Sequence, residues 1–250
     1  MMDTLSALDI TILAEDDDIL AVSKPVGLVV HPAYRHPNGT LTDAVFAYAD
    51  RSGTPRPWLL HRLDRETSGV VLFARTEKAR RMLVRQFQER HIAKRYLAII
   101  AGSLPAGVGD IDAPLGRDPK DRRRVVISAM GKPAHTRYQT LAKSGEFALA
   151  LAEPLTGRTH QIRAHLASQG APLVGDAVYG ATAEAARLAG VERVQLHAWE
   201  LRFRHPATGS DYAVRAPIPD DMRAACVTLG LRDGITTLAL LSRESYDESC

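Results

Sequence analysis

Hydrophobic residues occur along most of the chain in short runs that end at turn-forming residues. Two such runs, 10–14 and 20–23, flank the acidic turn Glu15–Asp18 and predict two strands joined by that turn. The nearly all-apolar run 69–74 predicts a strand that is buried on both faces. Similar runs predict further strands at 95–101, 125–128, 134–141, 147–153 and 196–203.

Apolar positions at helical spacing predict helices between these strands. After Thr76, which can serve as an N-cap, Ala79, Leu83 and Phe87 fall on one helical face. Further helices are predicted at 41–49, with Thr40 or Thr42 as cap, at 159–168, closed by Gly170, and at 220–229, capped by Asp220. Because strands and helices do not alternate regularly, the pattern indicates an α+β fold with a mixed, mostly antiparallel sheet flanked by helices.

The composition is typical of a soluble globular protein. Hydrophobic residues make up 45% and charged residues 24% of the 250 positions. No run approaches the roughly 18 apolar residues of a membrane helix, and Met1–Asp9 lacks the pattern of a secretory signal. Cys226 and Cys250 are the only cysteines, and neither has other ligand types at metal-binding spacing. We therefore expect a cytoplasmic, reduced protein without a metal.

Positive charge is concentrated in two central segments, although the formal net charge is only +3. Residues 75–95 hold eight Lys or Arg against two acids, and residues 117–137 hold seven against two. The last twenty residues, 231–250, hold two Lys or Arg against four acids. Basic segments of this kind suit a phosphate backbone. Charge alone, however, favours the simpler interpretation of two solvated faces on a slightly basic protein.

The densest group of polar residues is His61–Gly69, directly before the predicted strand 69–74. Side chains at the mouth of a rigid strand are well placed to form a site. Asp64 is a candidate catalytic carboxylate, and Arg62 and Arg65 are nearby cations that could keep it ionised. The same segment also fits a turn whose Asp, Thr and Ser side chains only satisfy backbone donors. On these residues alone, the structural interpretation is favoured.

His61–Asp64 also invites comparison with the catalytic loop of protein kinases. That loop needs Asp directly after Arg, Asn five residues later and a glycine-rich phosphate loop upstream. Here Leu63 intervenes, Gly69 stands where Asn is required, and the sequence has no glycine-rich phosphate loop. The spacing excludes the kinase alternative.

The segment His61–Gly69 resembles the signature of the RluA-type RNA pseudouridine synthases, which is His-Arg-Leu-Asp-x-x-Thr-Ser-Gly followed by an apolar strand. Related classes share the Leu-Asp core but usually place Gly near the position of His61, so His61 favours the RluA type. Other matching segments follow in chain order: Asp17–Pro32, Lys94–Ala98, Leu155–His165, Pro172–Gly180, Leu196–Ala198, His205–Pro206 and Ala216–Pro217. The resemblance covers the chain from residue 10 to residue 222.

The resemblance implies a cofactor-free conversion of uridine to pseudouridine in structured RNA, with three catalytic residues. Asp64 would attack a flipped uridine at the ribose or at the base. Tyr96 would stack on the base, for which its aromatic face is suited, and could take part in proton transfer. Arg163 would pair with Asp64, because a guanidinium can hold a carboxylate through two parallel hydrogen bonds. His160 and His165 are interpreted as structural histidines.

Arg62 would enter the RNA helix or hold the phosphate of the flipped nucleotide. Turning a base out of a stacked helix costs a few kcal/mol, and cations beside the site offset that cost through phosphate contacts. His61 is expected beside the RNA as well. Further phosphate-binding candidates are Arg65, Arg122, Arg123 and Arg124, for which a solvated loop is an equal alternative.

The resemblance also implies the domain organisation. Residues 1–230 would form a pseudouridine synthase catalytic domain with its cleft across the sheet, and residues 231–250 a peripheral or partly disordered tail. Many relatives carry a small RNA-binding domain ahead of the catalytic domain, and we expect this chain to lack it. Ribosomal RNA, transfer RNA or both are the expected substrates, and a monomer without an obligate protein partner is the simplest expectation.

Two alternatives remain open. The chain could be an RNA-binding or RNA-chaperone protein on a catalytic fold that has lost activity, although Asp64, Tyr96 and Arg163 are all present. A hydrolase that uses Asp64 and a histidine is more remote, because no nucleophile motif such as Gly-x-Ser-x-Gly supports it. The sequence does not identify the uridine or the RNA that is modified.

Overall fold

A computed structural model describes residues 10–32, 36–105, 107–121 and 123–247, with side chains as far as residue 239. The chain divides into two units by its internal contacts. Unit 1 consists of Met1–Arg95 and His197–Pro217, and unit 2 of Tyr96–Leu196 and Ile218–Cys250. Each unit is described by itself.

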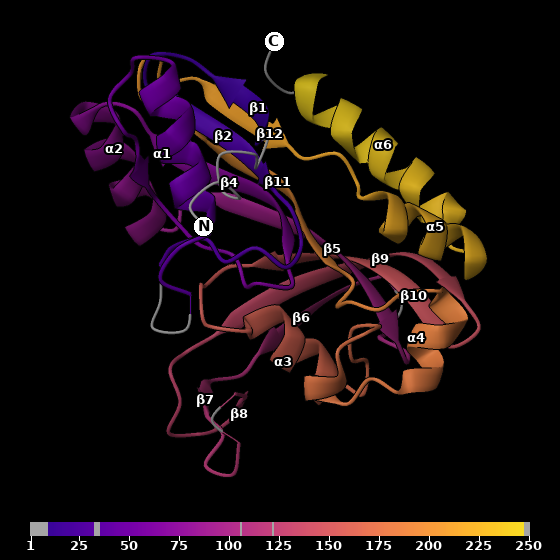
Figure 1. The fold of residues 1–250 in the computed structure, drawn as a ribbon. Helices are drawn as coiled ribbons and strands as arrows, with labels where there is room; N and C mark the ends of the chain where they lie inside the picture. Colours follow the sequence, from indigo (N-terminus) through magenta and orange to yellow (C-terminus); the bar gives the residue numbers. More distant parts are fainter. Residues whose placement is uncertain (1–9, 33–35, 106, 122, 248–250) are drawn as a thin grey trace. The chain divides into compact units, whose positions relative to one another are not determined.

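Unit 1 contains a sheet that includes the strand predicted at residues 69–74. Four strands lie in the order β1 (Thr11–Glu15), β2 (Ile19–Lys24), β4 (Ser68–Ala74) and β11 (Leu196–Arg204) (Figure 1). Outside this order, β12 (Asp211–Arg215) pairs with β11, and β3 (Trp58–Leu59) pairs with one end of β4. β4 and β11 run parallel, whereas the other pairs are antiparallel. Every residue of β4 is buried, as its continuous apolar sequence predicts.

Two helices of unit 1 begin at threonine N-caps. Thr40 caps α1 (Leu41–Arg51) in a capping box: its Oγ1 accepts the N–H of Asp43 at 3.3 Å, and its own N–H donates to the Asp43 carboxylate at 3.0 Å. Thr76 caps α2 (Glu77–Gln88) by accepting the N–H of Ala79 at 3.1 Å. On the inner face of α2, Ala79 and Leu83 pack into the same core cluster as Leu72 of β4, which confirms the predicted helical face.

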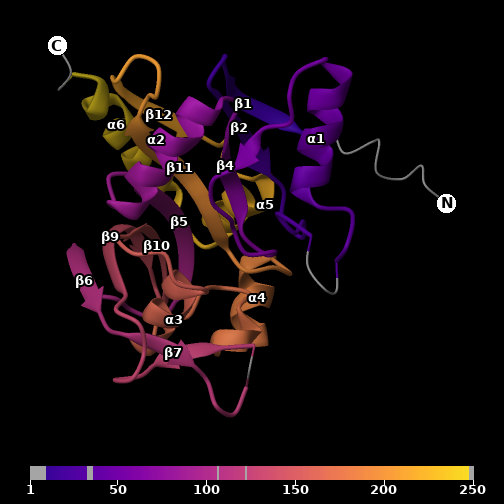
Figure 2. The same ribbon diagram turned by 90° about the vertical axis from the view of Figure 1, so that its left-hand side faces the viewer.

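Unit 2 contains an antiparallel sheet in the order β5 (Ala93–Ala101, with its residues from Tyr96 on in this unit), β10 (Phe147–Pro154), β9 (His135–Ser144) and β6 (Val108–Asp112). Helix α3 (Gln161–Ser168) packs on β9 and β10 (Figure 2). Leu166 of α3 is fully buried in a core cluster with Ala150 and Ala152 of β10.

Smaller elements complete this part of the chain. A separate hairpin is formed by β7 (Leu115–Arg117) and β8 (Val125–Ile127), followed later by the 3-10 turn η1 (Ala177–Tyr179) and helix α4 (Ala183–Ala189). The hairpin is short and lies outside the larger sheet.

Two helices stand at the end of the described chain. α5 (Asp220–Thr228) has Pro219 at its N-cap position, so Asp220 is the first helical residue and not the predicted cap. α6 (Arg232–Asp247) follows it, where the sequence analysis expected no element. Its first turns approach β9 closely: a Cβ at Gly234 would lie 3.0 Å from the Cβ of Ala142, and Leu238 is buried.

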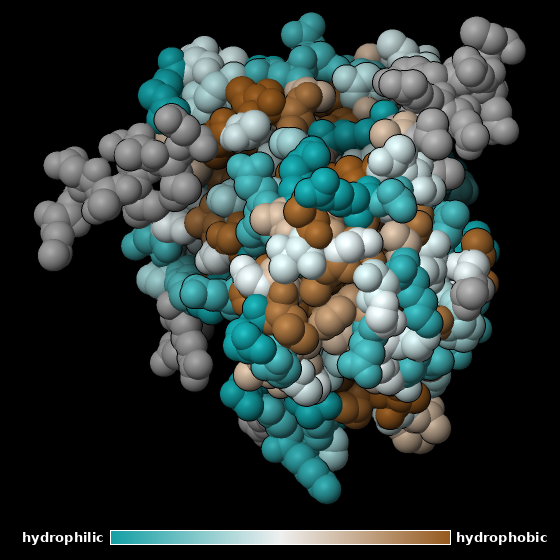
Figure 3. All heavy atoms as spheres, turned by 90° about the vertical axis from the view of Figure 1, so that its right-hand side faces the viewer, coloured by the Kyte–Doolittle hydropathy of each residue, from teal (hydrophilic) through white to brown (hydrophobic). Residues whose placement is uncertain are grey.

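The predicted α+β class with a mixed, mostly antiparallel sheet is confirmed. One helix start was wrong: α3 begins at Gln161, two residues later than predicted, because His160 adopts a left-handed backbone conformation with φ of 52°. Within the described residues, no helix is long and apolar enough to cross a bilayer. On the face shown in Figure 3, polar side chains interrupt the hydrophobic ones, as is usual for protein surfaces.

Candidate active site

The loop that carries Asp64 lies in unit 1, directly before β4. Leu63 is buried and anchors the loop in the core, whereas the side chain of Asp64 is only half-buried. The N–H of Thr67 donates to the carbonyl of Asp64 at 3.1 Å and closes a turn. The backbone on both sides of Asp64 is therefore fixed.

Lys24 ties this loop to the segment after β2. Its side chain is fully buried, and its ammonium donates to three backbone carbonyls: those of Pro25 and Leu28 at 2.8 Å each, and that of Arg65 at 3.1 Å. The N–H of Gly27 also donates to the Arg65 carbonyl, at 2.9 Å. A buried charge is tolerated only with such compensation, so Lys24 stabilises the loop that follows Asp64.

Gly69, the last residue of the motif, allows β4 to approach β11. Its φ is +119°, and a Cβ at this position would lie 2.1 Å from the carbonyl oxygen of Ala198. One residue earlier, the hydroxyl of Ser68 lies 3.0 Å from Nδ1 of His197 inside the core. The Ser-Gly end of the motif therefore fixes the pairing of two strands.

His61 bonds to the backbone of β4. Its Nε2 accepts the N–H of Leu72 at 3.1 Å, and its ring lies 5.2 Å from that of Phe87. Burial, together with the nearby Lys94 ammonium, lowers the pKa of His61 to about 3. The ring is thus neutral in the folded protein, as an acceptor at Nε2 requires. The expected contact of His61 with RNA stays a prediction.

The two arginines of the loop are exposed. Arg62 makes no hydrogen bond or ion pair with the residues that the structure describes, and Arg65 pairs with Glu66 at 2.8 Å on the surface. Both guanidinium groups can therefore reach a ligand in solvent.

Tyr96 lies in unit 2, on β5 opposite Ala152 of β10. Its half-buried ring packs against a core cluster that also contains Ile162, the neighbour of Arg163 on α3. One side of the ring is therefore supported by the core, which is the arrangement that a stacking platform needs.

Arg163 forms a buried ion pair with Asp176, a partner that the sequence analysis did not identify. Nε donates to one carboxylate oxygen at 2.7 Å and Nη2 donates to the other at 2.8 Å. A guanidinium has a second edge, Nη1–Nη2, which can serve another carboxylate at the same time. The pair with Asp176 fixes the orientation of that edge.

Gln161 fixes the start of α3 and hence the position of Arg163. Its Nε2 donates to the carbonyl of His135 at 2.8 Å and to Oγ1 of Thr136 at 3.0 Å. Its Oε1 accepts the N–H of Arg158 at 3.0 Å and the hydroxyl of Thr156 at 2.7 Å. The N-cap position is His160, whose side chain makes no capping hydrogen bond, so the Gln161 amide fastens the segment that leads into α3.

The two histidines of the same segment differ in their surroundings. His165 is fully buried, and its ring nitrogens lie 2.8 Å from Oγ1 of Thr136 and 2.9 Å from the carbonyl of Ala113. These contacts agree with a structural role for His165. His160 lies at the start of α3, with Nδ1 3.1 Å from the hydroxyl of Tyr179.

Arg123 and Arg124, in the loop between β7 and β8, already contact groups within the protein. Arg123 forms a bidentate pair with Asp121, through Nε at 2.9 Å and Nη2 at 2.7 Å, and this pair lowers the pKa of Asp121 to about 2. The guanidinium of Arg124 lies over the ring of Tyr179, 5.4 Å from its centroid. Arg122 lies outside the described residues.

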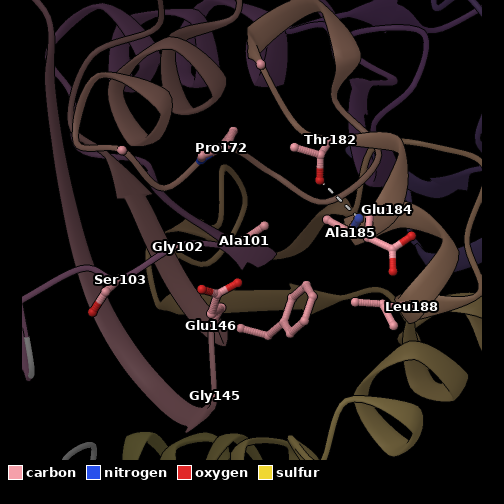
Figure 4. Close-up of a pocket in the computed structure, with 13 residues that line it drawn as sticks. Ala101, Gly102, Ser103, Gly145, Glu146, Pro172, Thr182, Glu184, Ala185 and Leu188 are labelled. Atoms are coloured by element: carbon pink, nitrogen blue, oxygen red, sulfur yellow. Dashed lines mark hydrogen bonds between the residues drawn. The ribbon is translucent and has the colours of Figure 1, made fainter.

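A pocket of about 520 Å³ lies in unit 2 near the C-terminal end of α3, and none of the predicted site residues lines it. In Figure 4, the side chains of Glu146, Glu184 and Leu188 border this pocket, and Thr182 accepts the N–H of Ala185. Within the part of the chain that the structure describes, no group of three or more His, Cys, Asp or Glu side chains could hold a metal ion.

The predicted site residues therefore fall on a few rigid elements. Asp64, Arg62, Arg65 and His61 share one loop of unit 1, whereas the others belong to unit 2: Tyr96 on β5, Arg163 on α3, and Arg123 and Arg124 on the hairpin. Sequence reasoning missed three supporting residues, namely Lys24, Asp176 and Tyr179. All three lie inside segments that resemble the family, so the sequence revealed these segments but not the structural roles of the three residues.

Comparisons with known proteins agree with the motifs. Residues 18–168 match the sequence model of a family described as RNA pseudouridylate synthase. This range includes Asp64, Tyr96 and Arg163. The match covers more than half of the chain.

Comparisons with individual proteins give the same result. The chain is 43% identical over 223 residues to ribosomal large subunit pseudouridine synthase D of Nitrosomonas europaea, a match that covers 87% of this chain and 64% of that protein. It is 37% identical over 246 residues to the protein of the same name from Xanthomonas campestris, covering 94% of this chain and 73% of the relative. The chain thus spans about two thirds of the length of these relatives.

The fold also matches a solved structure. Human RNA pseudouridylate synthase domain containing 1 superimposes with a TM-score of 0.70 and 27% identity, over 87% of this chain and 87% of that one.

Proposed function

This chain belongs to the family of RNA pseudouridylate synthases, and we propose that it converts uridine to pseudouridine in structured RNA. The observation that carries the proposal is the family match over residues 18–168, which spans all three proposed catalytic residues. The local structure is compatible with these roles: Asp64 is half-buried on a fixed loop, and Tyr96 has one supported ring face.

The reaction is an isomerisation that needs no oxidant, reductant or energy source. The bond between C1′ of the ribose and N1 of the base breaks, the base turns, and a bond forms between C1′ and C5. The proton on C5 is released to solvent, and N1 gains a proton. Asp64 is the proposed nucleophile, at the ribose or at the base, on a uridine flipped out of its stack.

Tyr96 and Arg163 are proposed to act together with Asp64 in the reaction. Tyr96 stacks on the flipped base, and its hydroxyl is available for proton transfer. The guanidinium of Arg163 is the positively charged group proposed to pair with the carboxylate of Asp64. Asp176 favours this role, because it engages the Nε–Nη2 edge of Arg163 and so fixes the direction of the Nη1–Nη2 edge.

RNA binding is proposed to depend on exposed cations beside the loop and on the hairpin. Arg62 is the best candidate, because it is exposed and has no partner among the described residues. Arg65, Arg123 and Arg124 are weaker candidates, because each already contacts a group within the protein. The names of the two bacterial relatives favour large-subunit ribosomal RNA over transfer RNA as substrate. We further infer a cytoplasmic monomer.

Release of tritium from RNA labelled at C5 of uridine tests the proposal directly. Purified protein is incubated with transcripts of ribosomal and transfer RNA, and pseudouridine is then mapped in whichever RNA releases tritium. We expect release from at least one ribosomal stem-loop without any added cofactor. RNA binding without release from any transcript would instead favour an RNA-binding protein that has lost activity.

A further inference from the structure

Tyr179 is a buried tyrosine whose contacts join two proposed parts of the site in unit 2. It lies in η1, three residues after Asp176, and only 6% of its surface is exposed. Its ring belongs to a small core cluster with Leu115 of the hairpin and Ala164 of α3. Tyr179 therefore touches both the hairpin and the helix that carries Arg163.

The ring of Tyr179 contacts two guanidinium groups. Cζ of Arg163 lies over the ring at 5.0 Å from its centroid, and Cζ of Arg124 lies over it at 5.4 Å. A cation over an aromatic face is stabilised most where water is excluded, and this ring is buried. A leucine at this position would fill the core but would offer neither cation an aromatic face.

The hydroxyl of Tyr179 makes the second set of contacts. It accepts the backbone N–H of Val125, the first residue of β8, at 2.9 Å. The same oxygen lies 3.1 Å from Nδ1 of His160, to which it can donate its proton. Burial raises the pKa of the Tyr179 hydroxyl, so that the proton is present at neutral pH. The hydroxyl thus fastens the hairpin, while the ring contacts Arg163.

We propose that Tyr179 is a positioning residue that orients Arg163 through its ring and anchors the β7–β8 hairpin through its hydroxyl. Arg163 is then held from two directions, by the Asp176 carboxylate and by the Tyr179 ring. Because Tyr179 contacts both parts, an RNA that binds the hairpin acts through Tyr179 on the orientation of Arg163. The catalytic consequence rests on the proposed function of Arg163, whereas the positioning itself does not.

Two substitutions separate the two contacts. Tyr179→Phe keeps the ring but removes the acceptor of the Val125 N–H, and Tyr179→Leu removes both. Tyr138→Leu is the matched control, because Tyr138 is also buried in unit 2 but packs in a different core cluster, the one that contains Ile100. All three variants are compared as the full chain, under conditions in which the same fraction of each protein is folded.

The first readout is independent of activity. The arginine Nε–H signal of Arg163 is assigned by NMR from its loss in Arg163→Lys. We expect Tyr179→Leu to shift this signal and to speed its exchange with water, while Tyr179→Phe and Tyr138→Leu leave it in place. In Tyr179→Phe, the amide of Val125 should exchange about five- to tenfold faster, as expected for the loss of one hydrogen bond. An unchanged Arg163 signal in Tyr179→Leu would overturn the proposal.

The second readout is the rate of pseudouridine formation. Tyr179→Leu should lower kcat about tenfold through the lost cation–π contact, whereas Tyr179→Phe should retain most of its kcat. Both variants release the hairpin and should raise KM for RNA by a similar factor. A kcat in Tyr179→Leu equal to that of Tyr138→Leu would contradict the catalytic consequence. If the unmodified protein releases no tritium, the proposed function fails, yet the NMR result still decides whether Tyr179 positions Arg163.

Discussion

Arg163 and Asp176 form a buried pair in which two guanidinium nitrogens meet the two oxygens of one carboxylate, at 2.7 and 2.8 Å. The pair joins α3 to the turn before η1, across the short segment 169–175. Because both side chains are buried, the charge of each is tolerated only in the presence of the other. The orientation of Arg163 therefore depends on Asp176.

Asp176→Asn should destabilise the protein strongly. The variant leaves the guanidinium of Arg163 buried without its carboxylate, for which about 3–5 kcal/mol is expected. Urea unfolding at neutral pH measures this loss. The exposed pair of Glu184 and Arg187 provides the control, because Glu184→Gln should change stability little. Equal losses in the two variants would contradict the structural importance of the buried pair.

The neutral state of His61 should make stability depend on pH. In the unfolded chain, His61 binds a proton below its ordinary pKa near 6.5, whereas in the folded protein its pKa is about 3. Its contribution is therefore complete above pH 6.5 and is lost progressively as the pH falls from 6.5 toward 3.

His61→Gln tests this dependence, because the glutamine oxygen can accept the N–H of Leu72 without being titrated. Between pH 7 and pH 4.5, the free energy of unfolding should fall more in the unmodified protein than in His61→Gln. His91→Gln, at a histidine whose side chain is 67% exposed, should follow the unmodified protein. A parallel pH dependence for all three proteins would refute the role assigned to His61.

Gly69→Ala should prevent β4 from pairing with β11. A Cβ there would lie 2.1 Å from the carbonyl oxygen of Ala198, on a backbone with φ of +119°. We expect a loss of about 3 kcal/mol or more, the range of severe core substitutions. Gly27→Ala is the control, because Gly27 also has positive φ but has nothing within 4 Å of the added carbon. Similar melting temperatures for the two variants would argue against the close approach of the strands.

Arg62→Ala should weaken RNA binding and its salt dependence. If Arg62 contacts one phosphate, the slope of log K against log salt should fall by about 0.7–0.9. Filter binding of one RNA at several salt concentrations measures both quantities. Arg81→Ala, at an exposed arginine on α2, removes the same charge elsewhere. The assignment fails if the two variants bind RNA with the same affinity and slope.

The hydrophobic pattern predicted the main strands and four of the helices, but it missed elements that depend on tertiary contacts. β7 is only three residues long, and its partner β8 and the Tyr179 hydroxyl hold the hairpin in place. α6 contains Gly234 and two threonines, which are poor helix formers. It nevertheless forms where Gly234 and Leu238 pack onto unit 2.

The motifs located the candidate site, although not the interactions that support it. Asp64 and Arg163 could be named because they lie in recognisable segments. The partner of Arg163 could not, because Asp176 is brought to α3 only by the fold. His61 shows the same limit: spacing along the chain does not reveal that its Nε2 accepts the N–H of Leu72.

The central claim is that Asp64 is the nucleophile, and the rate of tritium release by Asp64→Asn tests it most directly. This variant keeps the size of the side chain and removes its charge, and Glu66→Gln, in the same loop, is the matched control. We predict that Asp64→Asn lowers release by at least about a thousandfold, in line with the loss of a catalytic nucleophile, while RNA affinity and the activity of Glu66→Gln are retained. Pseudouridine formed by Asp64→Asn at the unmodified rate would contradict the account.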